Sequence, residues 1–468
     1  MTEIVRRSFF KASTFMKRYV WLLVLVLTSS TAFGESLPSF DWPQWQGPDR
    51  NGVSRERGLL AEWTEDGPPL AWRVNGLGGG YSAPTIAEGR VFGLSNLGDD
   101  EVVWALAETD GKTLWTTRLG PAFREGLPQG SEGPGSSPTV DGQRLYVLGS
   151  GGELACLQVD DGQIIWQVSL TRDLGGRVPG WRFNESPLVD RDLILCTPGG
   201  EETTLAALDK LTGELVWTSQ LPVVDEGPVA PRPGRGGRGF GGRGGGRGGG
   251  SSAAYASAIA FDLAGTRQYV QFTHRALIGV AASDGTLLWS YDRPANRMGI
   301  NCATPIHHDG FVLAASAYGT GGGLVKLAKD ASGGITAEEV WFTRRMQNHH
   351  GGMIVHDGYL YGANGGNEGG NLICIDFKTG EVMWDGRELP RGVAPKGSIV
   401  LGDGRLYYRH ESGTMTLVEV NPERYIERGR FEQPDRSRSP AWSHPVLANG
   451  KLYLRDQDLL LSYDVRAE

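Results

Sequence analysis

Five short segments of this chain align without gaps, and they constrain its fold more than any other feature. Each has a small residue first, glycine seventh and tryptophan eleventh. They are ALAETDGKTLW (105–115), CLQVDDGQIIW (156–166), ALDKLTGELVW (207–217), GVAASDGTLLW (279–289) and CIDFKTGEVMW (374–384), with a looser copy, KLAKDASGGITAEEVW, that ends at Trp341. An apolar strand, a turn whose glycine supplies positive φ and a second apolar strand are typical of a β-hairpin. The sequence therefore predicts one recurring hairpin.

A second element, which reads as strand, tight turn and strand, recurs eight times along the chain. Its copies span 82–95, 136–149, 185–198, 256–272, 303–316, 351–364, 397–410 and 443–456. A two-strand element followed by a two-strand hairpin makes a four-stranded unit. Eight such units predict an all-β fold, an eight-bladed β-propeller that occupies residues 69–468.

The last unit lacks a fourth strand, because the chain ends at LLLSYDVRAE. The segment PLAWRVNG (69–76) has Trp72 in the tryptophan position, so we expect it to complete the last blade and close the ring. Closure removes the exposed sheet edges that promote aggregation. The tryptophans expected to pack each blade on the next are Trp72, Trp115, Trp166, Trp217, Trp289, Trp341 and Trp384.

A Gly/Arg-rich tract, RPGRGGRGFGGRGGGRGGG (232–250), interrupts this regular pattern. Between Trp115 and Trp341 the intervals from one repeat tryptophan to the next are 51, 51, 72 and 52 residues. The long interval, from Trp217 to Trp289, exceeds its neighbours by about the 21 residues of 231–251. We interpret 231–251 as an insertion between the third and fourth blades. Its composition cannot bury a core and predicts disorder.

The N-terminus resembles an export signal. Lys17 and Arg18 precede an apolar run too short to span a bilayer, and a small-residue cleavage site follows near Gly34. We expect residues 1–34 to be removed on export to the periplasm or cell envelope, leaving an N-terminal segment (35–68) before the propeller. RRSFFK (6–11) leaves a twin-arginine route open beside the general one. No cysteine lies near the cleavage site, so we expect no lipid anchor there. We also expect no transmembrane span in the mature chain.

Charge argues against nucleic acid as the partner of the Gly/Arg tract. Removal of residues 1–34 takes away five basic residues and one acidic residue, so the net charge changes from −8 to −12. Outside the five arginines of the tract the mature chain carries about −17, and such a body repels the phosphates that dominate nucleic-acid affinity.

The D/T-G-x-x-x-W hairpins that end at Trp115, Trp166, Trp217, Trp289 and Trp384 resemble the PQQ-like propeller repeat. That repeat is known from quinoprotein alcohol dehydrogenases and from the BamB family of outer-membrane assembly proteins. The resemblance covers roughly residues 40–468, and DWPQWQGPDRNGVS (41–54) is similar to the start of exported PQQ-like proteins. It implies a fold more than a function, because one fold supports many activities.

The family's two branches imply different functions. Its dehydrogenases carry pyrroloquinoline quinone (PQQ), a Ca²⁺ site built from Glu, Asn and Asp, often adjacent cysteines, and sometimes a haem domain. This chain has no adjacent cysteines and no C-x-x-C-H motif. We therefore favour a monomeric, non-catalytic binding or scaffold module in the BamB manner, whose partner is an envelope protein or peptide. A PQQ- and Ca²⁺-dependent dehydrogenase remains the alternative.

Candidate site residues lie in the loops before the eight two-strand elements, which should line one mouth of the channel. For binding at this mouth we expect Tyr81, Tyr255, His349, His350, Trp442 and His444. If PQQ binds, the resemblance implies contacts from Glu185, Asn301, Lys396, Arg182 and Trp181, with Glu185 and Asn301 as oxygen ligands of Ca²⁺. The competing interpretation is that all of these only stabilise turns.

His349 and His350 raise the question of a transition metal, because imidazole is a common ligand. Adjacent strand residues point to opposite faces, so the sequence argues against one ion binding both. Cys156 and Cys374 occupy the small first position of the hairpin and are interpreted as buried. A disulfide between Cys156 and Cys196 is compatible with export.

Overall fold

A computed structural model describes residues 39–124, 133–220, 252–366 and 369–467. The predicted export signal (1–34) and the Gly/Arg-rich insertion (231–251) lie outside these residues. The chain divides into Met1–Ser39, of which only Ser39 is described, and Phe40–Glu468, to which everything below refers.

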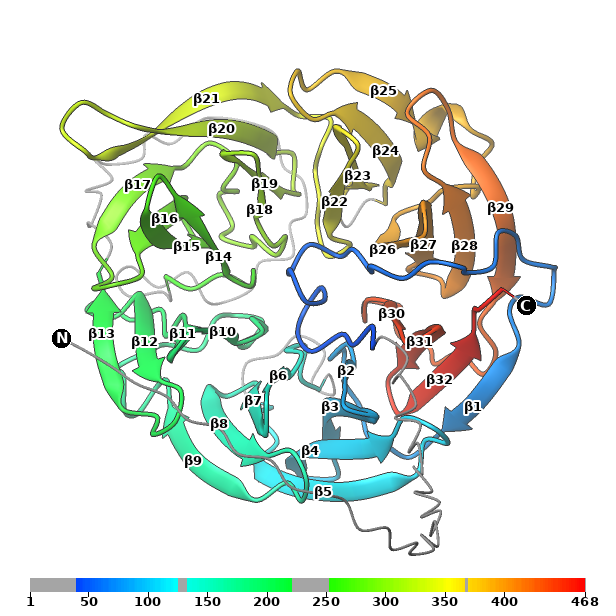
Figure 1. Cartoon of the computed structure of the whole chain (residues 1–468), viewed down its shortest axis with the longest axis horizontal. Helices are drawn as coiled ribbons and strands as arrows, with labels where there is room; N and C mark the ends of the chain where they lie inside the picture. Colours follow the sequence, from blue (N-terminus) through cyan, green and yellow to red (C-terminus); the bar gives the residue numbers. More distant parts are fainter. Residues whose placement is uncertain (1–38, 125–132, 221–251, 367–368, 468) are drawn as a thin grey trace, which may run out of the picture. The chain divides into compact units, whose positions relative to one another are not determined.

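Eight sheets of four antiparallel strands form a ring, so the predicted eight-bladed β-propeller is confirmed (Figure 1). Blade 1 contains β2 (Thr85–Ala87), β3 (Arg90–Leu97), β4 (Asp100–Ala107) and β5 (Thr113–Pro121). Blade 2 contains β6 (Thr139–Asp141), β7 (Arg144–Leu148), β8 (Glu153–Gln158) and β9 (Ile164–Ser169). Blade 3 contains β10 (Leu188–Asp190), β11 (Leu193–Cys196), β12 (Leu205–Asp209) and β13 (Leu215–Ser219). Blade 4 contains β14 (Ile259–Leu263), β15 (Thr266–Phe272), β16 (Leu277–Ala281) and β17 (Leu287–Tyr291).

The second half of the ring repeats this order. Blade 5 contains β18 (Ile306–His308), β19 (Phe311–Ser316), β20 (Gly321–Lys329) and β21 (Ile335–Thr343). Blade 6 contains β22 (Met353–His356), β23 (Tyr359–Asn364), β24 (Asn371–Asp376) and β25 (Val382–Asp385), followed by the short helix η1 (Gly386–Glu388). Blade 7 contains β26 (Gly397–Gly402), β27 (Arg405–His410), β28 (Thr414–Glu419) and β29 (Ile426–Glu432). Blade 8 contains β30 (Val446–Ala448), β31 (Lys451–Asp456), β32 (Leu459–Asp464) and, from the other end of the chain, β1 (Leu70–Val74).

The ring closes through blade 8 as the sequence predicts. β1 pairs antiparallel with β32, with Trp72 opposite Ser462 and Val74 opposite Leu460. Closure also involves a buried arginine: Arg455 on β31 is fully buried, and its guanidinium donates to the backbone carbonyls of Ser82 (3.0 Å) and Leu94 (2.6 Å) in blade 1. The first and last blades are therefore joined by side-chain as well as strand contacts.

Each repeated hairpin has the same irregular register. The small first residue of the hairpin lies opposite the tryptophan, and the tenth residue is left unpaired in a β-bulge. In blade 1, for example, Ala105 pairs with Trp115 and Leu106 with Thr113, so Leu114 has no partner. The same shift recurs in blades 2, 3, 4 and 6. Since a bulge adds an unpaired residue, the apolar side chain at position ten turns outwards; Leu114 is 48% exposed.

The repeated tryptophan and the repeated glycine meet across the blade boundary. The indole of Trp217 in blade 3 packs on the turn of blade 4, where a Cβ added to Gly285 would lie 2.5 Å from its ring, and its Nε1 donates to Ala282 O (3.1 Å). The equivalent indoles donate to a carbonyl of the following blade at 2.8–3.1 Å: Trp72, Trp115, Trp166, Trp341 and Trp384. Trp289 differs because the next hairpin is the looser copy, and its indole bonds Gln268 in its own blade (2.7 Å).

Residues 40–63 lie in the middle of the ring and then run outwards beside blades 7 and 8 (Figure 1). Trp42 forms a bridge with Ile86 of β2, Val53 with Leu401 of β26, and Leu59 with Arg466. Arg50 is buried and donates to the carbonyls of Ser186 and Pro187 just before β10. This segment has no repeat of its own, yet it contacts inner strands on opposite sides of the ring.

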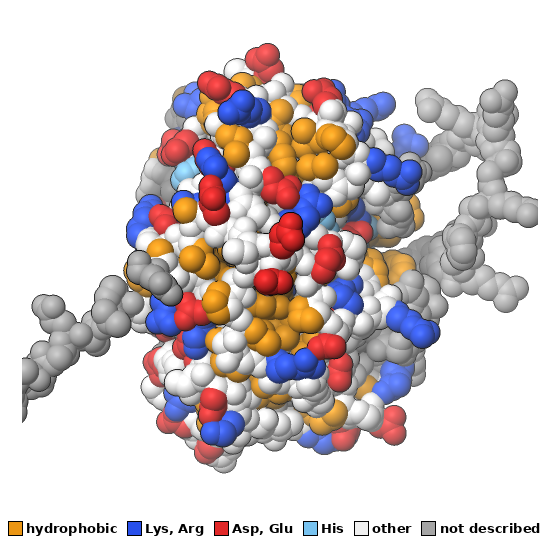
Figure 2. Space-filling model, turned by 90° about the vertical axis from the view of Figure 1, so that its right-hand side faces the viewer, with side chains coloured by type: hydrophobic (Ala, Val, Ile, Leu, Met, Phe, Trp, Pro, Cys, Tyr) orange, Lys and Arg blue, Asp and Glu red, His pale blue; other side chains and the backbone are white. Residues whose placement is uncertain are grey.

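Among the described residues there is no helix of the length and apolarity that crossing a membrane requires. All four cysteines, Cys156, Cys196, Cys302 and Cys374, have free thiols, and Cys156 and Cys374 are buried. The disulfide that the sequence left open is therefore not present. Acidic and basic side chains are interspersed between apolar ones on the side of the ring that Figure 2 shows.

Candidate binding cavity at the channel mouth

A cavity of about 700 Å³ opens at one mouth of the channel. Every loop that precedes an innermost strand contributes to it. Its lining includes Tyr81, Gly133, Trp181, Arg182, Asn184, Tyr255, Cys302, His349, His350, Lys396, Trp442 and His444, together with Trp45, Tyr318, Glu411 and Arg438. This volume and the mixture of aromatic walls with a few polar groups are typical of ligand-binding sites.

The structure brings most of the predicted site residues together. The six residues expected at the channel mouth all line the cavity, and so do Trp181, Arg182 and Lys396. Glu185 and Asn301 do not line it, and both are buried.

The oxygens of Glu185 are already engaged by internal donors. Thr197 donates through its backbone N (2.5 Å) and its hydroxyl (2.6 Å), and Gln271 donates through Nε2 (3.0 Å). Burial raises the pKa of Glu185 to about 7, although these hydrogen bonds and the nearby Arg50 act in the opposite direction. The carboxyl therefore joins β11 and β15 across the boundary of blades 3 and 4.

Asn301 is engaged in the same way. Its Oδ1 accepts from the backbone N (3.1 Å) and Nδ2 (3.0 Å) of Asn296, and its Nδ2 donates to Thr273 O (2.8 Å). Ca²⁺ requires six to eight oxygen ligands, and neither predicted oxygen donor faces the cavity. These residues do not fit a calcium–quinone site.

A charged network lies on the cavity wall between blades 6 and 7. Lys396, on the loop before β26, places Nζ 2.8 Å from Glu411 Oε1 and donates to His349 Nδ1 (3.1 Å) and Gly366 O (3.2 Å). Since His349 Nδ1 accepts this bond, its Nε2–H faces the Tyr318 hydroxyl, 3.0 Å away. Burial, and secondarily Lys396, lowers the pKa of His349 to about 3, so the imidazole is neutral at physiological pH.

His349 and His350 correct the expectation that adjacent histidines point apart. They lie in the loop between β21 and β22 rather than in a strand, and their rings stack with centroids 3.5 Å apart and planes 28° apart. The period-two rule does not apply to irregular backbone. Both imidazoles face the same cavity.

Aromatic rings form the rest of the wall. Trp442 contacts Tyr81 (centroids 5.1 Å apart) and His350 (4.7 Å), and its Nε1 donates to Glu411 Oε1 (3.0 Å). Across the cavity the Tyr255 hydroxyl accepts from the backbone N of Trp181 (3.2 Å). Fixed aromatic surfaces of this kind dominate the energetics of many protein interfaces.

Two residues of the lining have left-handed backbone, which is uncommon for side chains of their type. Arg182 has φ of 68° and Tyr318 has φ of 59°. Such conformations cost of order 1 kcal/mol and persist only where the surroundings impose them. Here they direct the two side chains into the cavity lining.

Trp45, Tyr318, Glu411 and Cys302 line the cavity but were not singled out in the sequence as site residues. Tyr318 and Glu411 lie in the turns between the second and third strands of blades 5 and 7, on the same side as the loops before the first strands. This position could have been predicted from the sequence. Because successive strands of a blade run in opposite directions, the turn between the second and third strands lies at the same mouth as the loop before the first strand. Trp45 belongs to the non-repetitive N-terminal segment and had no such signal.

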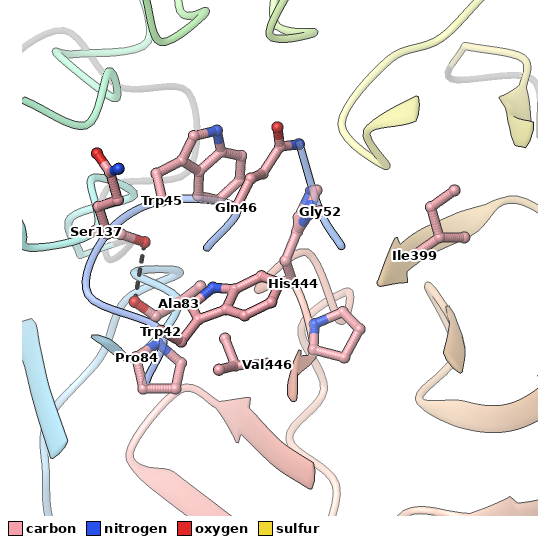
Figure 3. A pocket seen from close by; sticks show the side chains of 12 residues that line it. Trp42, Trp45, Gln46, Gly52, Ala83, Pro84, Ser137, Ile399, His444 and Val446 are labelled. Carbon is pink, nitrogen blue, oxygen red and sulfur yellow. Dashed lines mark hydrogen bonds between the residues drawn. The ribbon is translucent and has the colours of Figure 1, made fainter. Parts of the chain in front are cut away.

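A second, much smaller pocket of about 10 Å³ shares Trp45 and His444 with the cavity (Figure 3). Trp45 and His444 contact each other with ring centroids 4.6 Å apart, and Trp45 Nε1 donates to Thr304 (2.8 Å). Trp42 and Gln46 also line the small pocket, together with Ala83 beside β2 and Ile399 of β26. The N-terminal segment therefore packs between the cavity and the inner strands.

Comparison with known protein families matches this chain to the model described as outer membrane protein assembly factor BamB. It matches residues 47–177 and 99–386, which together cover more than half of the chain. The family predicted from the repeat is therefore confirmed.

Curated relatives carry the same description. BamB of Moranella endobia (strain PCIT) is 29% identical over 155 residues, covering 32% of this chain and 37% of the relative. BamB of Yersinia pestis is 22% identical over 253 residues, covering 53% and 52%. The chain spans about half or less of the length of these relatives.

Solved structures agree on the fold. BamB from Moraxella catarrhalis has a TM-score of 0.50 at 13% identity, covering 80% of this chain and 94% of that one. Quinohemoprotein alcohol dehydrogenase from Comamonas testosteroni has a TM-score of 0.60 at 13% identity, covering 92% and 81%. At such identities the likeness establishes the architecture alone.

Proposed function

The chain belongs to the family described by the model of outer membrane protein assembly factor BamB, and on that premise we propose that it is a non-catalytic binding module of the cell envelope. In this proposal a segment of an envelope protein inserts into the channel-mouth cavity. The observation that carries the proposal is the cavity itself, which all eight inner loops line. A ring of loops on a rigid scaffold is a common place for recognition.

The chemistry of the wall defines the segment that it would accept. Trp181, Tyr255, Tyr81 and Trp442 offer aromatic surface, whereas the three N–H groups of Lys396 are already taken by Glu411, His349 and Gly366. We propose that the partner contributes an apolar or aromatic side chain. The internally bonded oxygens of Glu185 and Asn301 favour this function over quinone-dependent alcohol oxidation.

Site-specific photo-crosslinking in intact cells tests the proposal. A photoreactive phenylalanine analogue replaces Trp181, which is 37% exposed at the cavity, or Leu215, which is 49% exposed on the outer strand β13. We expect a discrete crosslinked partner from position 181, identified by mass spectrometry as an envelope protein, and none from position 215. Trp442→Leu, which removes an aromatic ring from the cavity wall, should weaken the crosslink from position 181.

Two results would contradict the proposal. Equal crosslinking from positions 181 and 215 would show that the cavity does not select a partner. Turnover of alcohols by the purified protein with PQQ, Ca²⁺ and an artificial electron acceptor would show that the protein is catalytic.

We also propose that residues 1–34 direct export and are removed. Support comes from the basic residues Lys17 and Arg18 before an apolar run, and from relatives named as outer membrane assembly factors. Cell fractionation and N-terminal sequencing should find the mature chain in the envelope with Glu35 as its first residue. Substituting Arg6 and Arg7 by lysine distinguishes the routes, because only twin-arginine export should be lost.

A further inference from the structure

Three potential metal ligands meet at one side of the channel-mouth cavity. Cys302 comes from the loop between β17 and β18, and His349 and His350 come from the loop between β21 and β22. One ligand atom from each residue lies within 4.8 Å of the other two. Among the described residues, which include all eight histidines and four cysteines of the chain, no other group of three His, Cys, Asp or Glu side chains is so arranged.

Of the two imidazoles, His350 offers a free Nδ1, whereas the Nδ1 of His349 accepts a hydrogen bond from Lys396 (3.1 Å) that a metal would replace. The Nδ1 of His350 is buried and has no hydrogen-bond partner, since Glu411 Oε1 is 4.0 Å away. Burial lowers the pKa of His350 well below the usual histidine value, as it does for His349, so both rings keep the lone pair that a metal needs. Burial raises the pKa of Cys302 to about 12, so a bound metal would replace the thiol proton.

The donor set selects the class of ion. Thiolate and imidazole are preferred by Cu(I) and Zn(II), whereas Ca²⁺ and Mg²⁺ prefer oxygen ligands. Lys396 places its Nζ 3.1 Å from His349 Nδ1, and its positive charge disfavours a strongly cationic complex beside it. One thiolate with two neutral imidazoles gives a neutral complex with Cu(I) and a charge of +1 with Zn(II).

We propose that Cys302, His349 and His350 bind a single ion of this class, Cu(I) or Zn(II). The ligands of such an ion lie about 3.3–3.8 Å apart when metal–ligand distances are about 2.0–2.3 Å. Because the ligand atoms already lie within 4.8 Å of one another, the two loops need to approach by no more than about 1–1.5 Å on binding. The remaining coordination position faces the cavity, through which the ion enters.

Neighbouring side chains are placed to support this arrangement. With the metal on His349 Nδ1, the Nε2–H still donates to the Tyr318 hydroxyl, and a hydrogen bond of this kind fixes the orientation of a ligating imidazole. Lys396 loses His349 as an acceptor but keeps Glu411 (2.8 Å) and Gly366 O (3.2 Å). Binding therefore costs Lys396 one of its three hydrogen bonds.

Metal titration of the full mature chain tests the inference, which does not depend on the proposed scaffold function. Tag-free, reduced protein is titrated with Cu(I) and with Zn(II) against a chromophoric chelator, and with Co(II) as a spectroscopic probe. We expect one equivalent of metal, a thiolate-to-Co(II) charge-transfer band, and a higher melting temperature for the metal-bound protein. The Cu(I) and Zn(II) titrations distinguish the two ions.

Variants assign the ligands. Cys302→Ser and His350→Gln should each weaken binding at least about tenfold, and Cys302→Ser should abolish the Co(II) band. Cys156→Ala and His308→Gln are controls outside the cluster, and they should bind like the unsubstituted protein. Loss of the metal-induced rise in melting temperature in His350→Gln provides a second readout if Cys302→Ser folds poorly.

The inference is overturned if the unsubstituted protein binds no stoichiometric Cu(I) or Zn(II). It is also overturned if Cys302→Ser and His350→Gln bind as tightly as the two controls.

Discussion

The contact between Trp217 and Gly285 predicts that an added methyl group is costly only where an indole fills the space. Gly285 has φ of 75°, and a Cβ at this position would lie 2.5 Å from Trp217 Cε3 and 2.8 Å from Cζ3. Gly265, in the β14–β15 turn of the same blade, has φ of 83° and no heavy atom within 4 Å of its added Cβ. The two glycines share the left-handed backbone and differ in the space beside it.

The expected cost follows from this difference. Placing alanine in left-handed backbone costs about 1–2 kcal/mol, and Gly265→Ala should show this penalty alone. Gly285→Ala should add the cost of overpacking, typically about 1–3 kcal/mol, because the indole is buried and held by the bond from its Nε1 to Ala282 O. The quantity to measure is the difference in unfolding free energy between the two variants, from urea titrations.

A double variant tests the physical cause. Trp217→Leu removes the ring from the glycine, so Gly285→Ala in that background should cost no more than Gly265→Ala does in the original chain. The reasoning is refuted if Gly285→Ala and Gly265→Ala destabilise equally, within about 0.5 kcal/mol. It is also refuted if Trp217→Leu leaves the cost of Gly285→Ala unchanged.

Three further predictions concern the buried histidines, the closure of the ring and the insertion. Burial lowers the folded-state pKa of His410 to about 4 and that of His349 to about 3, so below about pH 6.5 the unfolded chain binds protons that the native chain does not. The histidine contribution to stability should therefore be complete above pH 6.5 and be lost as the pH drops towards 4, and His410→Gln should reduce this part of the pH dependence in thermal melts. Arg455→Met leaves buried carbonyls of blade 1 without a donor and should cost at least about 2 kcal/mol, whereas Arg73→Met, at a half-exposed ion pair, should change the unfolding free energy by less than about 1 kcal/mol. Deletion of residues 231–251 should change it by less than about 1 kcal/mol, and a large fall in melting temperature would contradict their interpretation as an insertion.

The fold was predictable because the repeat residues are subject to strict geometric requirements. Gly285 needs positive φ for its turn and open space for Trp217, and the same pair of constraints recurs around the ring. The strand order also predicted which loops share a mouth, so residues as distant in sequence as Tyr81 and His444 could be expected at one cavity.

Side-chain direction within the loops was not predictable in this way. His349 and His350 follow no strand period, and their shared orientation depends on a loop conformation that the repeat does not encode. Glu185 resembled a metal ligand in sequence, but its partner Thr197, directly after β11, engages both of its oxygens. Trp45 reaches the cavity through a segment that has no counterpart in the other blades.

The pairing of β1 with β32 also dictates an order of assembly. The first strand has to wait for nearly the entire chain before its partner exists, so blade 8 is the last to form during synthesis. The entropic cost of closing so long a loop grows only logarithmically with its length, but contacts this distant in sequence slow folding. Removing a few residues from either β1 or β32 would therefore break the same strand pairing and leave an unpaired strand edge in blade 8.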